Sequence, residues 1–321
     1  MIKPEFSIES TINAILQKKP KILLLQFPEG LKTETVKIAR EIEKKTGTKT
    51  VSIIEPCYGA CDLPLQEMKT LKADLAIHFG HTQFMKSKKI LYVPLNYPLK
   101  KTILKKLVLA LSGKLKEKEF KRIGLLSTAQ FLKWLPATKK MLEENGFTVL
   151  ISNSGSMRKG QVLGCNTMAA KRIATKTDCF VFVGDGQFHP LGIAYNTNKP
   201  VFALNPFAEN ISEVSEREID RRERAHLARI EIAKQAKSFG ILVSTKPGQM
   251  ALKKALELKS LAEKRRKKAL ILASSEIREE FVLGLGLECF VNTACPRLSI
   301  DDAPHWKKLL VSAEEMREAL E

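Results

Sequence analysis

A pattern of short apolar runs that alternate with helical segments occurs three times along this chain of 321 residues. Each occurrence has strand-like runs rich in β-branched and other apolar residues, and a helical pattern follows the first run. Neighbouring parallel strands need a crossover connection, which is usually a helix, so this alternation predicts parallel sheets built from strand–helix units. The expected strands are 22–26, 50–54, 75–80 and 90–95 in the first occurrence, 123–128, 148–152, 179–184 and 201–204 in the second, and 240–245, 269–273, 289–293 and 309–311 in the third.

The three occurrences predict an α/β fold of three similar small domains. We place the first repeat at residues 1–100, the second at 101–208 and the third at 209–321. The third repeat begins with a strongly charged segment, 209–237, whose pattern indicates a linking helix. Further helices are expected at 33–45, 135–145 and 249–264. When the third strands of the repeats are aligned, His81, Asp185 and Cys295 take equivalent positions.

One cysteine in each repeat lies in a segment rich in Gly, Ala or Pro that follows an apolar run. These cysteines are Cys61, Cys165 and Cys295. Open α/β sheets place their ligands at the carboxyl ends of the strands. One thiolate from each of three such loops is what an iron–sulfur cluster needs when one of its irons stays open for a further ligand. The sequence therefore predicts a pseudo-threefold arrangement of the three parallel-sheet domains around a central iron–sulfur site.

The other cysteines occur in different surroundings. Cys179 and Cys289 begin apolar strands, and we interpret them as buried small hydrophobic residues. Cys57 precedes Cys61 in a Cys-x-x-x-Cys spacing, which is a weak metal signal without a second cysteine pair. We favour Cys61 as the ligand and keep Cys57 as the alternative. His78 falls within an expected strand, and we interpret it as a structural histidine with satisfied hydrogen bonds.

The chain is strongly basic, with a formal net charge of +19 from 54 Lys and Arg residues against 35 Asp and Glu residues. Such a charge favours acidic partners. However, the lysines are scattered over helix-like segments that also carry acidic residues, and the aromatic content of 7% offers no stacking platform for bases. We therefore expect a solvated surface and no direct nucleic-acid binding. Because no long apolar segment or signal core occurs, we expect a soluble cytoplasmic protein with no membrane contact.

Two more groups of polar residues follow expected strands. His189 lies in a Gly-rich segment and suits a catalytic base, a substrate anchor or a residue that fixes a turn. Arg297, Asp301 and Asp302 follow the last cysteine, and they suit either the carboxylate and amine of a substrate or local ion pairing. The segment Gly184-Asp185-Gly186 lacks the third glycine of a dinucleotide fingerprint, so it gives no support for NAD binding.

Four motifs together carry a family resemblance: Tyr58-Gly59-Ala60-Cys61-Asp62, Gly160-Gln161-Val162-Leu163-Gly164-Cys165-Asn166, Phe188-His189-Pro190, and Ala294-Cys295-Pro296-Arg297 with Asp301-Asp302. In this order and spacing they resemble the archaeal diphthamide biosynthesis enzymes, the 2-(3-amino-3-carboxypropyl)histidine synthases. The similarity runs from Leu23 to the region of Trp306, which is nearly the whole chain.

The resemblance implies a non-classical radical S-adenosylmethionine transferase. By that resemblance, Cys61, Cys165 and Cys295 hold a 4Fe–4S cluster, and S-adenosylmethionine binds at the open iron as co-substrate. An electron from an external donor cleaves the methionine-side Cγ–S bond, and the resulting 3-amino-3-carboxypropyl radical adds to a histidine of elongation factor 2, leaving methylthioadenosine. This is the first step of diphthamide biosynthesis, and the family consists of homodimers of three-domain subunits.

The remaining site residues are candidates for contacts to S-adenosylmethionine. Catalytic roles are assigned to His189 and Arg297, which suit its carboxylate. The candidates for cofactor binding, several of them near strand ends, are Gln26, Gln130, Gln161, Gln249, Gly184, Asp185 and Arg297.

Two other functions stay open as alternatives. Quinolinate synthase shares the pattern of three domains with three single cysteines around a cluster, but it uses the open iron as a Lewis acid on small substrates. The motifs around Cys165 and Cys295 favour the diphthamide enzymes over it. A basic RNA-binding protein with a structural metal is the alternative from another class, and it predicts nucleic-acid binding that falls steeply with salt.

Overall fold

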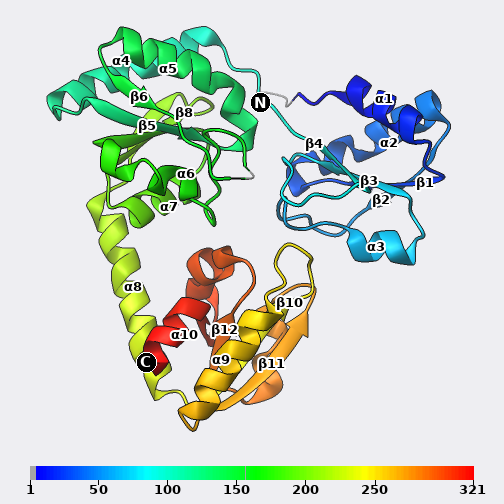
Figure 1. Cartoon of the computed structure of the whole chain (residues 1–321), viewed down its shortest axis with the longest axis vertical. Helices are drawn as coiled ribbons and strands as arrows, with labels where there is room; N and C mark the ends of the chain where they lie inside the picture. Colours follow the sequence, from blue (N-terminus) through cyan, green and yellow to red (C-terminus); the bar gives the residue numbers. More distant parts are fainter. Residues whose placement is uncertain (1–4, 156) are drawn as a thin grey trace. The chain divides into compact units, whose positions relative to one another are not determined.

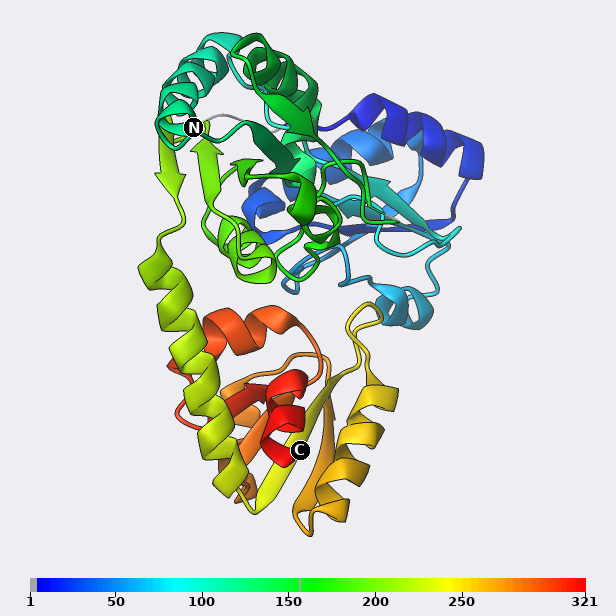
Figure 2. The ribbon, with the colours of Figure 1, turned by 60° about the vertical axis from the view of Figure 1, so that its left-hand side comes forward.

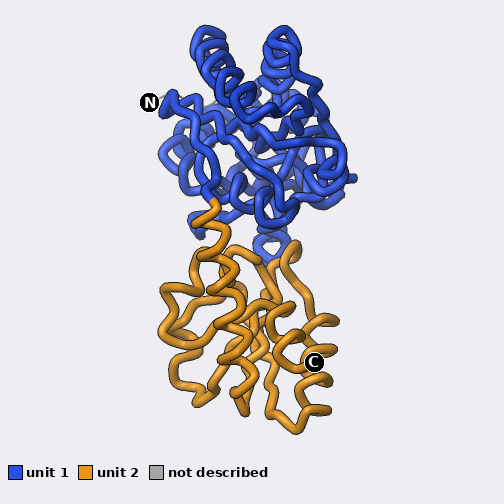
Figure 3. The backbone as a smooth tube through the Cα atoms, turned by 90° about the vertical axis from the view of Figure 1, so that its left-hand side faces the viewer, with its two compact units in different colours: residues 1–215 blue, residues 216–321 orange. Residues whose placement is uncertain are grey.

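The computed structural model describes residues 5–155 and 157–321, and it divides into two compact units (Figure 1). The first unit comprises residues 1–215 and the second comprises residues 216–321 (Figure 3). The first unit holds the sheets of the first two repeats and the second unit holds the sheet of the third, while residues 209–215 of the predicted third repeat fall in the first unit. Across the described ranges, no helix combines the length and the apolar character that a membrane crossing requires.

The three predicted parallel sheets are confirmed. The sheet of the first repeat has the strand order β2-β1-β3-β4, the second has β6-β5-β7-β8-β9, and the third has β11-β10-β12-β13. The strands are β1 Ile22–Gln26, β2 Lys49–Ile53, β3 Leu75–Phe79, β4 Ile90–Val93, β5 Arg122–Ser127, β6 Thr148–Leu150, β7 Cys179–Val183, β8 Val201–Asn205, β9 Asn210–Glu213, β10 Ser238–Ser244, β11 Lys268–Ser274, β12 Cys289–Asn292 and β13 Leu309–Ser312.

Strand pairing gives the repeats a common register. Leu75 of β3 pairs with Leu23 of β1, Cys179 of β7 pairs with Ile123 of β5, and Cys289 of β12 pairs with Phe239 of β10. Leu75, Cys179 and Cys289 are therefore equivalent. The residues six positions later are His81, Asp185 and Cys295, so the predicted equivalence of these three is confirmed.

One strand departs from the predicted pattern. The expectation of a helix over the whole of 209–237 was wrong at its start, because β9 lies there and pairs antiparallel with β8. The pairing joins Phe202 to Glu213 and Leu204 to Ile211. The linking helix itself, α8, begins only at Glu216 and runs to Gln235.

Helices cover both faces of the second sheet, with α4 and α5 on one side and α6 and α7 on the other (Figure 1). In the second unit, α8, α9 and α10 pack over one face of the third sheet, and α8 runs alongside α10 (Figure 2). The helices are α1 Ile8–Lys18, α2 Thr35–Thr46, α3 Leu65–Thr70, α4 Lys101–Glu117, α5 Leu135–Glu144, α6 Met168–Lys171, α7 Phe188–Thr197, α8 Glu216–Gln235, α9 Leu252–Lys264 and α10 Ala313–Leu320.

An acidic residue just before the third strand of each sheet accepts hydrogen bonds from the backbone at the start of the first strand. In the first repeat, Asp74 accepts hydrogen bonds from the backbone amides of Lys21 and Ile22 at 2.7 and 3.2 Å. Asp178 accepts in the same way from the amides at 121 and 122, at 2.9 and 2.7 Å. Glu288 accepts from the amide of Lys237 at 2.6 Å. These acids satisfy backbone donors at the amino-terminal end of each first strand, opposite the end that carries the cysteine loops.

Candidate metal and cofactor site

All three predicted cluster cysteines lie in loops at the carboxyl ends of strands. Cys61 lies between β2 and α3, Cys165 lies between β6 and α6, and Cys295 follows β12 directly. Cys165 is exposed, and the other two are half-buried. Thiols at these positions are accessible to a metal cluster, which is what a ligand role requires.

The two cysteines interpreted as core residues are confirmed as such. Cys179 and Cys289 are fully buried at the starts of β7 and β12. Burial raises the pKa of each thiol to about 12, with nearby carboxylates adding to the effect. A metal ligand must be a thiolate, so these two residues do not suit a cluster. The candidates that remain for an iron–sulfur group are Cys61, Cys165 and Cys295, with Cys57 still the alternative to Cys61.

The Cys165 loop is shaped by close packing of small residues. Leu163 and Asn166 exchange two backbone hydrogen bonds, of 3.0 and 2.9 Å, which leaves Gly164 and Cys165 at the tip of a tight turn. A Cβ atom on Gly164 would lie 1.9 Å from the ring of Phe188, which begins α7. Only glycine fits there, so the packing of α7 fixes where the Cys165 backbone runs.

A buried asparagine shapes the Cys295 loop instead. Asn292, at the end of β12, donates from Nδ2 to the carbonyl of Cys295 at 2.8 Å and to Oγ of Ser299 at 2.9 Å. Its Oδ1 accepts from the amide of Ala294 at 2.9 Å. The side chain is 5% exposed, so these bonds are shielded from water. They hold the loop in one conformation around the cysteine.

The Cys61 loop is closed by its own backbone and by an aspartate. The amide of Asp62 donates to the carbonyl of Gly59 at 2.9 Å, which forms a turn around the cysteine. The Asp62 carboxylate is buried and accepts from the amide of Tyr58 at 3.2 Å. A Cβ on Gly59 would stand 3.9 Å from the Cys61 sulfur, so the glycine keeps the side of the thiol open.

Two of the predicted glutamines are buried and engaged with other residues. Gln26 is 5% exposed, and its Oε1 lies 2.6 Å from Nδ1 of His78. Gln161 is 2% exposed and donates to Oγ1 of Thr82 at 2.9 Å, which ties the second repeat to the first. Both side chains position neighbouring loops in this structure.

The other predicted glutamines are half-buried beyond the strand ends. Gln130 lies in the 3₁₀ turn Ala129–Trp134 after β5, and Gln249 lies between β10 and α9. In the common register of the sheets, Gln26, Gln130 and Gln249 are not equivalent to one another. Any shared role for the three therefore comes from their loops rather than from the repeat.

The predicted charged and histidine residues lie in two regions of the chain, one after β7 that includes the first turn of α7 and one after β12. His189 is half-buried and stacks on Phe182 with ring centroids 5.8 Å apart. Oδ1 of Asp185, which follows Gly184, accepts from Nδ2 of Asn205 at 2.8 Å. In the second unit, exposed Arg297 pairs with Asp301 at 2.8 Å, which is one of the two roles expected for this segment. Burial and the nearby Asp301 raise the pKa of Asp302.

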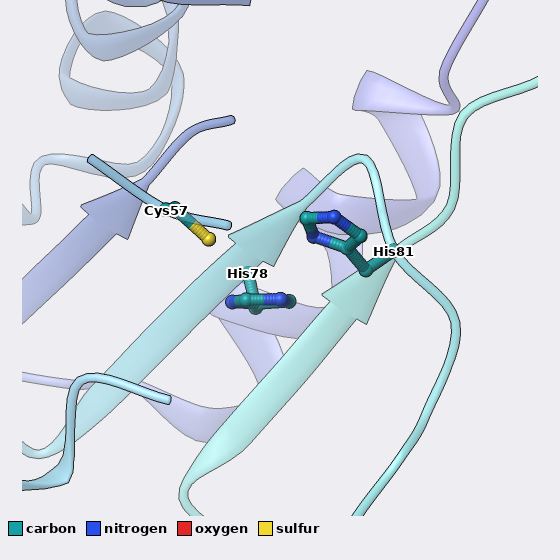
Figure 4. A group of neighbouring side chains, drawn as sticks. All are labelled: Cys57, His78 and His81. Atoms are coloured by element: carbon teal, nitrogen blue, oxygen red, sulfur yellow. The ribbon is translucent and has the colours of Figure 1, made fainter. Parts of the chain in front are cut away.

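The sequence analysis missed one cluster in the first repeat. Cys57, His78 and His81 each offer a ligand atom, and these atoms lie within 4.8 Å of one another (Figure 4). The interpretation of His78 as fully satisfied was wrong, because its Nε2 has no hydrogen-bond partner among the described residues. Burial lowers the pKa of His78 to about 3 and that of His81 to about 4, so both rings are neutral at pH 7. The sequence signal was a His-x-x-His spacing across a glycine.

Comparison with known proteins extends over nearly the whole chain. The model of the family described as "Putative diphthamide synthesis protein" matches residues 27–321. The 2-(3-amino-3-carboxypropyl)histidine synthase of Pyrococcus horikoshii is 34% identical over 306 residues, which cover 92% of this chain and 84% of that protein. The Caenorhabditis elegans 2-(3-amino-3-carboxypropyl)histidine synthase subunit 1 is 31% identical over 327 residues, covering 98% of this chain and 80% of that protein.

A solved structure agrees with these sequence matches. The crystal structure of Dph2 from Pyrococcus horikoshii with a 4Fe–4S cluster matches with a TM-score of 0.89 at 31% identity, covering 100% of this chain and 91% of that one. The resemblance carried by the cysteine motifs is therefore confirmed by the whole sequence and by the fold. The chain belongs to the diphthamide synthesis family.

Proposed function

We propose that this protein transfers the 3-amino-3-carboxypropyl group of S-adenosylmethionine to a histidine of elongation factor 2, the first step of diphthamide formation. In this proposal Cys61, Cys165 and Cys295 bind a 4Fe–4S cluster. The observation that carries it is that the three accessible cysteines lie in strand-end loops, in a chain of a family whose relatives are named for this transfer. The cluster reported for the Pyrococcus horikoshii structure supports the same assignment.

The bound cluster would supply one electron to the sulfonium of S-adenosylmethionine, so that its methionine-side Cγ–S bond breaks to give methylthioadenosine and a 3-amino-3-carboxypropyl radical. The chain's own task is to position the co-substrate and to keep water away from the radical. The loops that carry Cys61, Cys165 and Cys295 would hold the cluster and orient the methionine carbon of the co-substrate, and the choice of the bond that breaks would follow that orientation.

Specific residues have roles in this positioning. His189 and Arg297 are proposed to bind the carboxylate of S-adenosylmethionine, and Asp185 is proposed to contact one of its polar groups. Gln130 and Gln249, which are half-buried beyond strand ends, suit the same purpose. Gln26 and Gln161 act from the interior, since their side chains hold His78 and Thr82.

The partners follow from the chemistry. Elongation factor 2 is the protein substrate, and an external electron donor reduces the cluster. We propose a homodimer that works in the cytoplasm, without membrane or nucleic-acid contact. The net charge of +19 favours docking on an acidic surface of the substrate protein.

Product analysis tests this proposal. The protein is purified anaerobically with its cluster, reduced in the presence of S-adenosylmethionine, and the nucleoside products are separated by chromatography. We expect methylthioadenosine, and the mass of added elongation factor 2 should rise by one aminocarboxypropyl group. If 5′-deoxyadenosine dominates instead, the transfer mechanism is wrong even with an intact cluster.

A further inference from the structure

The cluster formed by Cys57, His78 and His81 has the donors and the burial of a metal site. One thiol and two imidazole nitrogens lie within 4.8 Å of one another at the end of β3 (Figure 4). Cys57 is 4% exposed and His78 is 0% exposed. Among the described residues, His78 Nε2 and His81 Nδ1 are buried with no hydrogen-bond partner.

Two unpartnered ring nitrogens on neighbouring side chains need a physical explanation. Leaving a buried polar atom without a partner costs about 1–3 kcal/mol, so native structures rarely keep such atoms without a role. Both nitrogens belong to side chains that contact each other, with ring centroids 4.8 Å apart. A shared ligand satisfies both at once.

The hydrogen bonding of His78 prepares it as a ligand. Its Nδ1 lies 2.6 Å from Oε1 of Gln26, and an amide oxygen only accepts. The Nδ1 atom therefore carries the proton, and the Nε2 atom keeps its lone pair. Metal-bound histidines commonly donate the second ring N–H in this way, which fixes the tautomer and the ring orientation.

The backbone holds His81 against His78. Gly80 between them has φ of +82°, a conformation that other residues adopt only with strain. A Cβ there would also lie 2.8 Å from Cγ of Pro28, so the turn is available to glycine alone. This turn keeps the two rings together at the strand end rather than letting the chain run on.

We propose that Cys57, His78 and His81 bind a zinc ion through one thiolate and two imidazole nitrogens. Zinc takes sulfur at about 2.3 Å and nitrogen at about 2.0–2.1 Å, which places tetrahedral donors roughly 3.5 Å apart. The donors, now within 4.8 Å of one another, would have to come closer by rotation of their side chains when zinc binds. The buried Asp62 carboxylate interacts electrostatically with His81. Its negative charge would offset the positive charge that a zinc ion keeps after it binds one thiolate. Three protein ligands leave the fourth position open to water.

Metal analysis of the cluster-loaded full chain tests this inference, which stands apart from the proposed transfer reaction. The anaerobic holoprotein is dialysed against micromolar zinc and then against buffer, and zinc and iron per chain are measured by mass spectrometry. We expect one zinc per chain. Cys57→Ala and His81→Ala should each lower zinc at least tenfold and leave iron unchanged.

Matched variants separate this site from others. Cys179→Ala removes a cysteine, and His305→Ala removes an exposed histidine, and both should keep the zinc. Cys165→Ala should lose iron but keep zinc. Zinc loss in Cys165→Ala would place the zinc on the cluster cysteines and overturn the inference, as would iron loss in Cys57→Ala.

X-ray absorption at the zinc edge keeps the inference falsifiable if a variant fails to fold. This measurement uses the unaltered holoprotein, and iron does not contribute at that edge. We expect one sulfur neighbour near 2.3 Å and nitrogen or oxygen neighbours near 2.0 Å. A shell of nitrogen and oxygen alone, a shell of several sulfurs, or no retained zinc would overturn it.

Discussion

In the first repeat the proposed cluster ligand follows the second strand of the sheet, whereas in the third repeat it follows the third strand. Cys61 comes after β2, and Cys295 comes after β12. The two sheets nevertheless have the same strand order, and in both an acidic side chain accepts a hydrogen bond from a backbone amide at the amino-terminal end of the first strand. In the first repeat the position equivalent to Cys295 is occupied by His81, one of the three proposed zinc ligands.

This difference shows that the sheets and the cluster ligands are determined by different parts of each repeat. The repeated backbone supplies a parallel sheet whose carboxyl edge accepts a ligand, but it does not dictate which loop provides the thiol. The loops use different means to hold their cysteines: glycine packing at Cys165 and a buried asparagine at Cys295. Loop changes should therefore alter iron content, and scaffold changes should alter stability alone.

The largest effect is expected from Gly164→Ala. The added methyl would overlap the Phe188 ring, and relieving that overlap should cost about 3 kcal/mol and displace the Cys165 loop. We expect a lower midpoint of denaturant unfolding and a several-fold loss of iron per chain. Gly113→Ala in α4 is the control, since nothing lies within 4 Å of its Cβ position; it should leave iron unchanged and, because alanine favours a helix interior over glycine, raise the unfolding midpoint slightly. Full iron content in Gly164→Ala would show that the loop tolerates displacement.

Asn292→Ala tests the hydrogen bonds that hold the Cys295 loop in the third repeat. Losing the three buried hydrogen bonds of Asn292 should lower the free energy of unfolding by about 2 kcal/mol and reduce the cluster absorbance. Ser299→Ala removes only one of these bonds and should have a smaller effect on both. Equal losses in the two variants would mean that the Cys295 loop is not held by the asparagine.

Asp178→Asn tests the shared scaffold. Burial acts to raise the pKa of Asp178, but hydrogen bonds from Arg122 and from the amides of 121 and 122 together outweigh it and hold the pKa at about 2, below the ordinary 3.8. A depressed pKa means that this stabilisation is present above about pH 4 and is lost as the pH falls toward 2. Replacement should cost about 1 kcal/mol at pH 7 and flatten the unfolding free energy over that range, with unchanged iron. A fall in iron content per chain would show that the hydrogen bonds of Asp178 also support the cysteine loops.

The smallest effect is expected at β9, which only the second repeat has among the described sheets. Lys118, the residue that follows α4, pairs with Glu213 of β9 at 2.9 Å, and both side chains are exposed. Glu213→Gln should change the free energy of unfolding by less than about 0.5 kcal/mol, as measured by urea titration. A change well above 1 kcal/mol would make this strand part of the stability shared by the repeats.

Much of the scaffold could be predicted because strand positions depend on local apolar runs. β1 and β7 follow such runs closely, and the register that equates His81 with Cys295 could be read from the third strands alone. β9 could not be predicted, since Asn210–Glu213 holds a single apolar residue and becomes a strand only by pairing with β8.

Site residues could be predicted where a single residue type, cysteine, supplies the ligand. They were harder to predict where the site depends on contacts between residues from different strands and loops. Cysteines at strand ends stand out by composition. The partnership of Gln26 with His78, and of both histidines with Cys57, depends on how β1, β3 and a distant loop meet. No local pattern encodes that meeting, so a glutamine assigned to the co-substrate proved to be buried against a histidine.

Two of the proposed cluster thiols follow the second strand of their sheet, and the third, Cys295, follows a third strand, yet all three are proposed to hold one cluster. Iron and acid-labile sulfide per chain, measured on anaerobically purified variants, test this proposal most directly. Cys61→Ala, Cys165→Ala and Cys295→Ala should each lose the cluster, while Cys179→Ala and Cys289→Ala, at the buried strand starts, should keep it. Retention of four irons per chain in Cys295→Ala, or cluster loss in Cys179→Ala, would contradict the account.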